Sequence, residues 1–220
     1  SRLVSEMKRY GAKTGIQISH GGRKGGQQRA YEGNGPLTDR DIAAGSERLY
    51  PMGASPIPLS DGWLTPIEMN EEQIEGVIDA FVAGARRAIL AGFDLLELHM
   101  AHGYLLQSFL SPLANQRTDR WGGSLENRMR LPLTVVARLR EIMPKSMPLL
   151  ARLSVTDWIE GGWTEGDSVV LARRLKEAGV DLIDCSSGGN MRSGATNSNL
   201  SRGPGYQVAL SDRLRRGAGI

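Results

Sequence analysis

Apolar positions along the chain follow two periods, and the change of period separates predicted helices from predicted strands. The clearest helical pattern begins after Asn70 and ends at Gly92, with apolar residues three and four positions apart on one face. Further helices are predicted up to Gly11, over 124 to about 143, from about 167 to 179, and over 209–216. Short alternating or apolar runs predict strands over 13–19, 94–99, 148–154 and 181–187.

Strands and helices therefore alternate, which is the order of a parallel sheet with helical crossovers. The predicted strands end in polar, reactive residues, at Gln17 and His20, at His99 and His102, at Arg152, and at 185–187. Functional groups gather in this way at the carboxyl ends of the strands of a (β/α)8 barrel. A doubly wound sheet would usually open with a G-x-G-x-x-G turn, and no clear one opens a helix in this sequence. We therefore expect an α/β fold of the (β/α)8, or TIM-barrel, type.

The predicted strands are too few for a complete barrel. The final stretch, "GAGI", has the character of an approach to a fifth strand, whereas a barrel needs eight strands and typically about 250 residues. We expect a single domain over 1–220 that forms a partial barrel, about strands 3 to 6 and the start of strand 7. Residues 21–69 are rich in Gly and Pro and show no period, which predicts a lid or binding loop.

Composition narrows the possible partners and the compartment. The chain has 220 residues, 40% of them apolar, with no apolar run long enough to predict a membrane span. The net charge is +3, but basic residues are scattered among 24 acidic ones, so we do not expect nucleic-acid binding. A single cysteine, Cys185, fits a reducing compartment, and we expect a cytoplasmic protein.

The stretch "HMAHGY", residues 99–104, concentrates reactive side chains at the end of a predicted strand. His99 and His102 could supply two ligands of a metal site, although only His20 remains as a third imidazole and no nearby acid is compelling. They could also be buried structural histidines. The interpretation we prefer is a site for a carbonyl oxygen or oxyanion, in which two imidazole N–H groups converge and Tyr104 donates a proton.

Four stretches resemble the Old Yellow Enzyme family of FMN-dependent ene-reductases. They are "IQISHGGRK", "ELHMAHGYLLQSFLSPLANQRTDRWGGSLENR", "ARLSVTDW" and "VDLIDCSSGG", and the similarity extends over nearly the whole chain. The His-x-x-His form resembles the bacterial xenobiotic-reductase branch. The resemblance implies FMN as cofactor, NADPH or NADH as hydride donor, an activated alkene as small-molecule substrate, and a homo-oligomeric whole protein.

The resemblance also implies roles for individual residues. Gln17 would bind the pyrimidine edge of the flavin, and Arg152 would lie near its N1 and O2 atoms. His99 and His102 would bind the substrate oxygen, and Tyr104 would deliver the proton. The simpler alternatives are that Gln17 caps a turn, that Arg152 forms an ion pair with Glu97 or Asp157, and that Tyr104 is structural.

Other matching residues point to structure rather than to chemistry. Arg117, Asp119 and Arg128 are expected to fix a loop through ion pairs, and Cys185 to be a small core residue. Gly122 and Gly123 would allow a tight turn before Ser124.

Segments that hold the flavin and its phosphate elsewhere in the family have no counterpart in these residues. Three alternatives therefore stay open: a dienoyl-CoA reductase-like flavoenzyme, a metal-dependent barrel lyase or hydrolase, and an inactive fragment.

Overall fold

The computed structural model describes residues 1–33, 35–190 and 203–220. The helices are α1 (Arg2–Arg9), α2 (Asp39–Ala43), α3 (Glu71–Ala91), α4 (Leu105–Leu110), α5 (Leu125–Ile142), α6 (Glu165–Glu177) and α7 (Val208–Ala218), with short 3-10 helices η1 (Gly22–Lys24) and η2 (Ala30–Glu32). The strands are β1 (Gly15–Ile18), β2 (Met52–Gly53), β3 (Ile67–Glu68), β4 (Leu95–Met100), β5 (Leu149–Ser154) and β6 (Leu182–Ser186). None of the described helices is long and apolar enough to cross a membrane.

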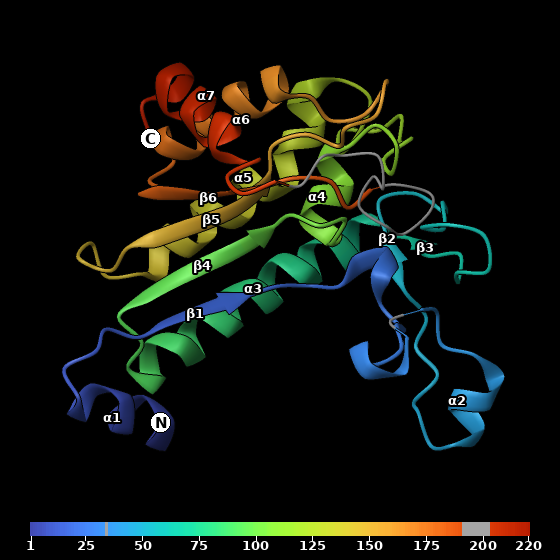
Figure 1. The fold of residues 1–220 in the computed structure, drawn as a ribbon, viewed down its shortest axis with the longest axis horizontal. Helices are drawn as coiled ribbons and strands as arrows, with labels where there is room; N and C mark the ends of the chain where they lie inside the picture. Colours follow the sequence, from blue (N-terminus) through green and yellow to red (C-terminus); the bar gives the residue numbers. More distant parts are fainter. Residues whose placement is uncertain (34, 191–202) are drawn as a thin grey trace.

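The main sheet contains four parallel strands in the order β1-β4-β5-β6. The four strands predicted from the sequence are therefore confirmed. Their order in space follows their order along the chain, as in a barrel, whereas a doubly wound sheet reverses its order at a switch point. The helices α3, α5, α6 and α7 pack successively beside one another along this sheet (Figure 1).

The two faces of the sheet differ in polarity because side chains alternate along each strand. In β4, Leu96, Leu98 and Met100 are fully buried in the core that the helices cover. Glu97 and His99 point to the opposite face. Paired residues of neighbouring strands share a face, so this second face also carries the side chains of Gln17, Arg152 and Asp184. We call it the inner face, defined by Gln17, Glu97, His99, Arg152 and Asp184.

Helix boundaries follow the capping residues. Asn70 and Ser124 cap α3 and α5 as predicted, since their side chains accept hydrogen bonds from backbone N–H groups of the first turn. The helix predicted from about Asp167 begins at Glu165 instead, because Thr164 is its N-cap and Asp167 completes the capping box. The C-terminal "GAGI" ends α7 and forms no strand within the described residues.

The long loop is more structured than the sequence suggests. Residues 21–69 contain η1, η2, α2 and the small parallel β2–β3 ladder. The arrows of β1 and β4 point toward this ladder and toward α4, so the segment lies beyond the carboxyl ends of those strands (Figure 1). It is therefore placed to cover a site at that edge.

Arg117 ties the long loop to the segment that follows α4. Its guanidinium forms a 2.5 Å ion pair with Asp119 and donates hydrogen bonds to the carbonyl oxygens of Ala54 and Met69. The expected ion pair of Arg117 is thus confirmed. The expected ion pair of Arg128 is wrong, because its guanidinium donates instead to the carbonyl oxygens of Leu110 and Gly123, and no carboxylate partner occurs in the described ranges.

The tight turn expected at Gly122 and Gly123 is present. A Cβ at Gly122 would lie 2.5 Å from Cβ of Arg117, and Gly123 has a φ of +76°. Cys185 lies on the helix-covered face of β6, half-buried against the core as expected, and burial raises the pKa of its thiol.

Candidate active site

The site is built on the carboxyl end of β4. His99 lies near the end of that strand on the inner face, and the chain then reverses through two residues with positive φ, His102 at +58° and Gly103 at +73°. The reversal folds His102 back over His99, so that Nε2 of His99 and Nδ1 of His102 are 3.1 Å apart. The two imidazoles are therefore adjacent, as the spacing predicted, but they contact each other, and their convergence on a substrate oxygen stays a prediction.

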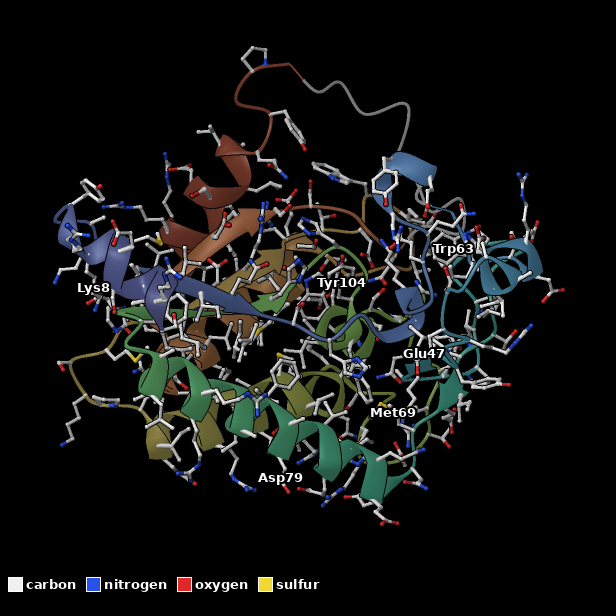
Figure 2. All side chains as sticks on the ribbon, turned by 90° about the horizontal axis from the view of Figure 1, so that it is seen from below. Lys8, Glu47, Trp63, Met69, Asp79 and Tyr104 are labelled. Carbon is white, nitrogen blue, oxygen red and sulfur yellow. The ribbon has the colours of Figure 1, made fainter. Side chains whose placement is uncertain are left out.

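Tyr104 stands beside this pair at the start of α4. Its ring centroid lies 4.6 Å from that of His99, with an angle of 30° between the ring planes. Figure 2 shows Tyr104 in the middle of the molecule, whereas Lys8 and Asp79 lie at its periphery. The imidazoles and the phenol thus form one cluster, which we call the His–His–Tyr cluster, consisting of His99, His102 and Tyr104.

Neighbouring loops hold the reversal in place. The backbone N–H of His102 donates to Oγ of Ser154 at 3.0 Å, and the N–H of Gly103 donates to Oε1 of Gln107 at 2.5 Å. Gly103 also touches the loop that follows β6, because a Cβ at Gly103 would lie 2.2 Å from the carbonyl oxygen of Gly189. A left-handed conformation at a non-glycine residue such as His102 costs of order 1–3 kcal/mol, and these contacts offset that cost.

A continuous line of hydrogen bonds passes through both rings. The N–H of Ala101 lies 3.2 Å from Nδ1 of His99, and Nε2 of His99 contacts Nδ1 of His102. Nε2 of His102 lies 2.6 Å from Oγ of Ser186, the last residue of β6. All four nitrogens of the two rings therefore have partners within the protein.

The surroundings keep both imidazoles neutral. Burial, reinforced by the charges of neighbouring groups, lowers the pKa of His99 to about 4 and lowers that of His102 as well. Burial also lowers the pKa of the Lys24 ammonium, to about 8. Lys24 and Arg152 both place positive charge near the cluster. This charge favours an oxyanion at the cluster and disfavours an imidazolium.

Arg152 occupies the centre of the inner face, in register with His99 on one side and Asp184 on the other. Its Nε lies 3.2 Å from Oδ2 of Asp184, while the predicted alternative partners were Glu97 and Asp157. Those alternatives are wrong: the carboxylate of Glu97 accepts a hydrogen bond from Gln17, and Asp157 is buried in a separate network. The Nε atom is buried and makes no hydrogen bond of good geometry, so the contact with Asp184 is an ion pair only.

Gln17 lies in the middle of β1, so the alternative that it caps a turn is wrong. Its Nε2 donates to Oε1 of Glu97 at 2.5 Å across the strand pair. Gln17 and Glu97 form the row of the inner face next to the row of His99 and Arg152.

The inner face thus offers an amide and a guanidinium whose Nε is buried without a hydrogen-bond partner. An amide suits the donors and acceptors of a flavin pyrimidine edge, and a guanidinium suits its anionic reduced form. The residues present therefore fit FMN.

Sequence reasoning missed a buried polar network beneath the cluster. Asp157 is fully buried and accepts hydrogen bonds from Nε2 of Gln107, Oγ of Ser111 and the N–H of Trp163. Burial raises the pKa of its carboxyl group. Asn190 connects this network to Arg23, whose guanidinium donates to the side chain and backbone of Asn190, and burial lowers the pKa of Arg23 to about 10. The only signal in the sequence was the position of Asp157 just beyond a predicted strand.

The third imidazole, His20, is not part of the His–His–Tyr cluster. His20 binds the N–H of Gly22 through Nδ1 and lines a hollow of about 460 Å³ along the free edge of β1. Across the described part of the chain, no three His, Cys, Asp or Glu side chains group closely enough to hold a metal ion.

The fold and the site together define a class: a parallel α/β protein of the barrel type that carries two buried imidazoles, a phenol and a guanidinium close together at the carboxyl ends of its strands. Comparison with known proteins makes the assignment more specific. A model of the NADH:flavin oxidoreductase / NADH oxidase family matches residues 1–209. The chain belongs to this family, and both the resemblance to the Old Yellow Enzymes and the TIM-barrel type of fold are confirmed.

Individual relatives agree with the family. The chain is 43% identical over 218 residues to an NADPH dehydrogenase of Geobacillus sp. (strain WCH70), covering 99% of this chain and 56% of that protein. It is 41% identical over 218 residues to an NADPH dehydrogenase of Bacillus licheniformis, with the same coverage. The solved structure of a 2-naphthoyl-CoA reductase complex superposes with a TM-score of 0.77 at 30% identity, covering 98% of this chain and 32% of that one. The chain spans about half the length of the curated relatives it matches.

Proposed function

We propose that the whole protein is an NAD(P)H-dependent FMN oxidoreductase that reduces an alkene activated by a carbonyl or nitro group. Family membership supports the flavin and the nicotinamide, and the names of the relatives favour NADPH as donor. The observation that carries the proposed substrate class is the His–His–Tyr cluster, which combines two adjacent imidazoles with a phenol close to the positive charges of Arg152 and Lys24.

Gln17 and Arg152 would hold the flavin against the inner face. The Gln17 amide would exchange its bond with Glu97 for the pyrimidine edge, and the Arg152 guanidinium would turn its Nε, which makes an ion pair but no hydrogen bond, toward the cofactor. FMN, when bound, supplies the hydride that it has taken from the nicotinamide. Arg152 favours the reduced cofactor because a fixed positive charge stabilises the negative charge of that form.

His99 and His102 would bind the substrate oxygen and withdraw electrons from the alkene. Both rings are neutral, so they would act as hydrogen-bond donors to the negative charge that develops on that oxygen. Tyr104 would give its proton to the α carbon, since its phenol stands next to the pair at the start of α4.

Stopped-flow measurement of the two half-reactions in the FMN-loaded whole protein tests these roles. We expect His99→Ala or His102→Ala to slow enone reduction about 10²–10³-fold, the usual cost of a lost oxyanion donor. Reduction of the flavin by the nicotinamide should suffer less, because no substrate oxygen becomes charged in that step. Tyr104→Phe should slow enone reduction while leaving binding of a phenol nearly unchanged. Equal slowing of both half-reactions by the histidine variants would contradict the proposal.

A second candidate substrate is an unsaturated CoA thioester. It is favoured by the likeness to the 2-naphthoyl-CoA reductase, at 30% identity. A thioester carbonyl would use the same His–His–Tyr cluster, so kcat/KM for crotonyl-CoA against cyclohex-2-enone separates the two candidates. A preference of more than about tenfold for the thioester would favour this second assignment.

A further inference from the structure

The hydrogen bonds around the paired imidazoles fix where their protons lie. The N–H of Ala101 can only donate, so Nδ1 of His99, at 3.2 Å, is the unprotonated nitrogen of that ring. A proton on Nδ1 would point at another donor. The proton of the neutral His99 ring is therefore on Nε2, and it is donated to Nδ1 of His102 at 3.1 Å.

The same reasoning extends to the second ring. Because Nδ1 of His102 accepts from His99, the neutral His102 ring carries its proton on Nε2. That proton is donated to Oγ of Ser186 at 2.6 Å. The line of bonds thus has a single direction, from the Ala101 backbone through His99 and His102 to the Ser186 hydroxyl.

This direction conflicts with the binding of a substrate oxygen between the two rings. The gap between them receives one N–H, from His99, and one lone pair, from Nδ1 of His102. A carbonyl oxygen placed there would gain one donor and face one repulsive lone pair. Two donors can converge on that oxygen only if the proton of His102 moves to Nδ1.

Resting on the oxygen-binding role proposed above, we propose that Ser186 is a positioning residue that allows His102 to change tautomer when the substrate binds. In the free protein, Ser186 accepts from Nε2–H of His102. With a carbonyl bound, His102 carries its proton on Nδ1, directed at the substrate oxygen, and the Ser186 hydroxyl donates to the bare Nε2. The half-buried ring gives its Nε2 proton to solvent water and takes one from solvent water at Nδ1, so the ring stays neutral and no other side chain changes its protonation.

Ser186 suits this function because a hydroxyl both donates and accepts by rotating its proton. Its side chain is 6% exposed, and His102 is the only hydrogen-bond partner of the hydroxyl in the described ranges. The adjacent Ser187 accepts from Gln207 instead. Among the residues that the structure describes, no other group holds the Ser186 proton in one direction.

The charged groups around His102 keep both states of the ring neutral. Burial, Arg152 and Lys24 lower the pKa of His102, while Asp184 acts in the opposite sense. An imidazolium would carry both N–H groups and would need no switch, so the proposal applies to neutral pH.

Nitrogen NMR of the whole protein, labelled with ¹⁵N-histidine and loaded with oxidised FMN, tests the switch directly. Cyclohex-2-enone is the probe, since a ketone accepts hydrogen bonds but has no proton to donate, and oxidised flavin does not turn it over. We expect His99 to stay protonated on Nε2 and His102 to change from Nε2–H to Nδ1–H when the enone binds. If His102 stays Nε2–H while the His99 signals respond, the switch is overturned and the oxygen-binding role survives. If the enone binds and neither ring responds, both proposals fail.

A second test compares Ser186→Asn with Ser186→Asp, whose new side chains have nearly the same size. In Ser186→Asn the amide can present either a donor or an acceptor to His102, whereas the carboxylate in Ser186→Asp can only accept. At pH 9, where His102 is neutral, we expect Ser186→Asp to bind the enone at least about tenfold more weakly than Ser186→Asn, the cost of one unmade hydrogen bond. Ser187→Ala is the control and should bind as the wild type does. Equal enone affinity of the Asn and Asp variants would overturn the proposal.

Discussion

Replacing Gly103 by alanine tests whether the loops around the site are held by backbone contact. Gly103 follows His102 in the reversal after β4, and the loop that follows β6 lies directly against it. A matched control exists in the same chain, because Gly123 has nearly the same left-handed conformation, with φ of +76° against +73°.

The expected magnitudes follow from what a new Cβ would meet. An alanine in the left-handed region costs roughly 1–2 kcal/mol at either position. At Gly123 the nearest atom would be the carbonyl oxygen of Arg117 at 3.8 Å, an ordinary contact. At Gly103 the Cβ would lie 2.2 Å from the carbonyl oxygen of Gly189, so one backbone must move, at a further cost of roughly 1–3 kcal/mol or more. We expect about 2–5 kcal/mol in total for Gly103→Ala, against about 1–2 kcal/mol for Gly123→Ala.

The assay is urea unfolding of both variants of the whole protein at one fixed FMN concentration, because a bound cofactor adds to stability. Gly103→Ala should also slow enone reduction more than flavin reduction, since the displaced loop carries His102. If both alanine variants unfold at the same urea concentration, the close backbone contact does not hold the site together.

Three further outcomes are expected. Burial lowers the pKa of His99 to about 4, so the native state binds fewer protons than the unfolded state from about pH 6.5 down to 4, and stability should fall as the pH drops through this window. The test is urea unfolding of the wild type and of His99→Gln at pH 7, 5.5 and 4. Between pH 7 and pH 4 the unfolding free energy of the variant should fall by roughly 3 kcal/mol less than that of the wild type. An equal dependence on pH in the two proteins would contradict this. Asp157→Asn should lower the unfolding free energy by roughly 2–4 kcal/mol in the same assay, because the new amide N–H must face buried donors. A loss below about 0.5 kcal/mol, as for a surface substitution, would count against the network. The 220 residues alone should show no cooperative transition by calorimetry, since β1 and β6 are each paired on one side only in the described sheet; a sharp transition would refute this.

The parts of the fold that could be predicted are those governed by local pattern. The start of α3 was predicted because Asn70 is a strong capping residue and a periodic apolar face follows it. The helix α4 was not predicted, because all six of its residues are buried and it therefore shows no polar face. The long loop gave no period, and its small ladder depends on contacts between segments that are distant in sequence.

The candidate site also has a part that could be predicted from the sequence and a part that could not. His99, His102 and Tyr104 lie within six residues, so a strand followed by a turn was enough to predict that they meet. The groups that orient them come from far along the chain: Ser154 is 52 residues from His102, and Ser186 is 84 residues away. Arg23 and Asn190 are separated by 167 residues. The parallel order of β1, β4, β5 and β6 brings these residues to one edge.

The low basicity of the imidazoles assigns the two tasks of the proposed reaction to different residues. With a pKa of about 4, His99 is neutral at pH 7 and can donate a hydrogen bond, but it has no spare proton to give up. The positive charges of Arg152 and Lys24, which help to keep it neutral, also favour negative charge on a bound oxygen. A proton for the substrate carbon must then come from another group, and Tyr104 is the one whose ring lies against the pair. In the proposed reaction, oxygen binding by neutral donors and protonation by a separate phenol would thus share one electrostatic arrangement.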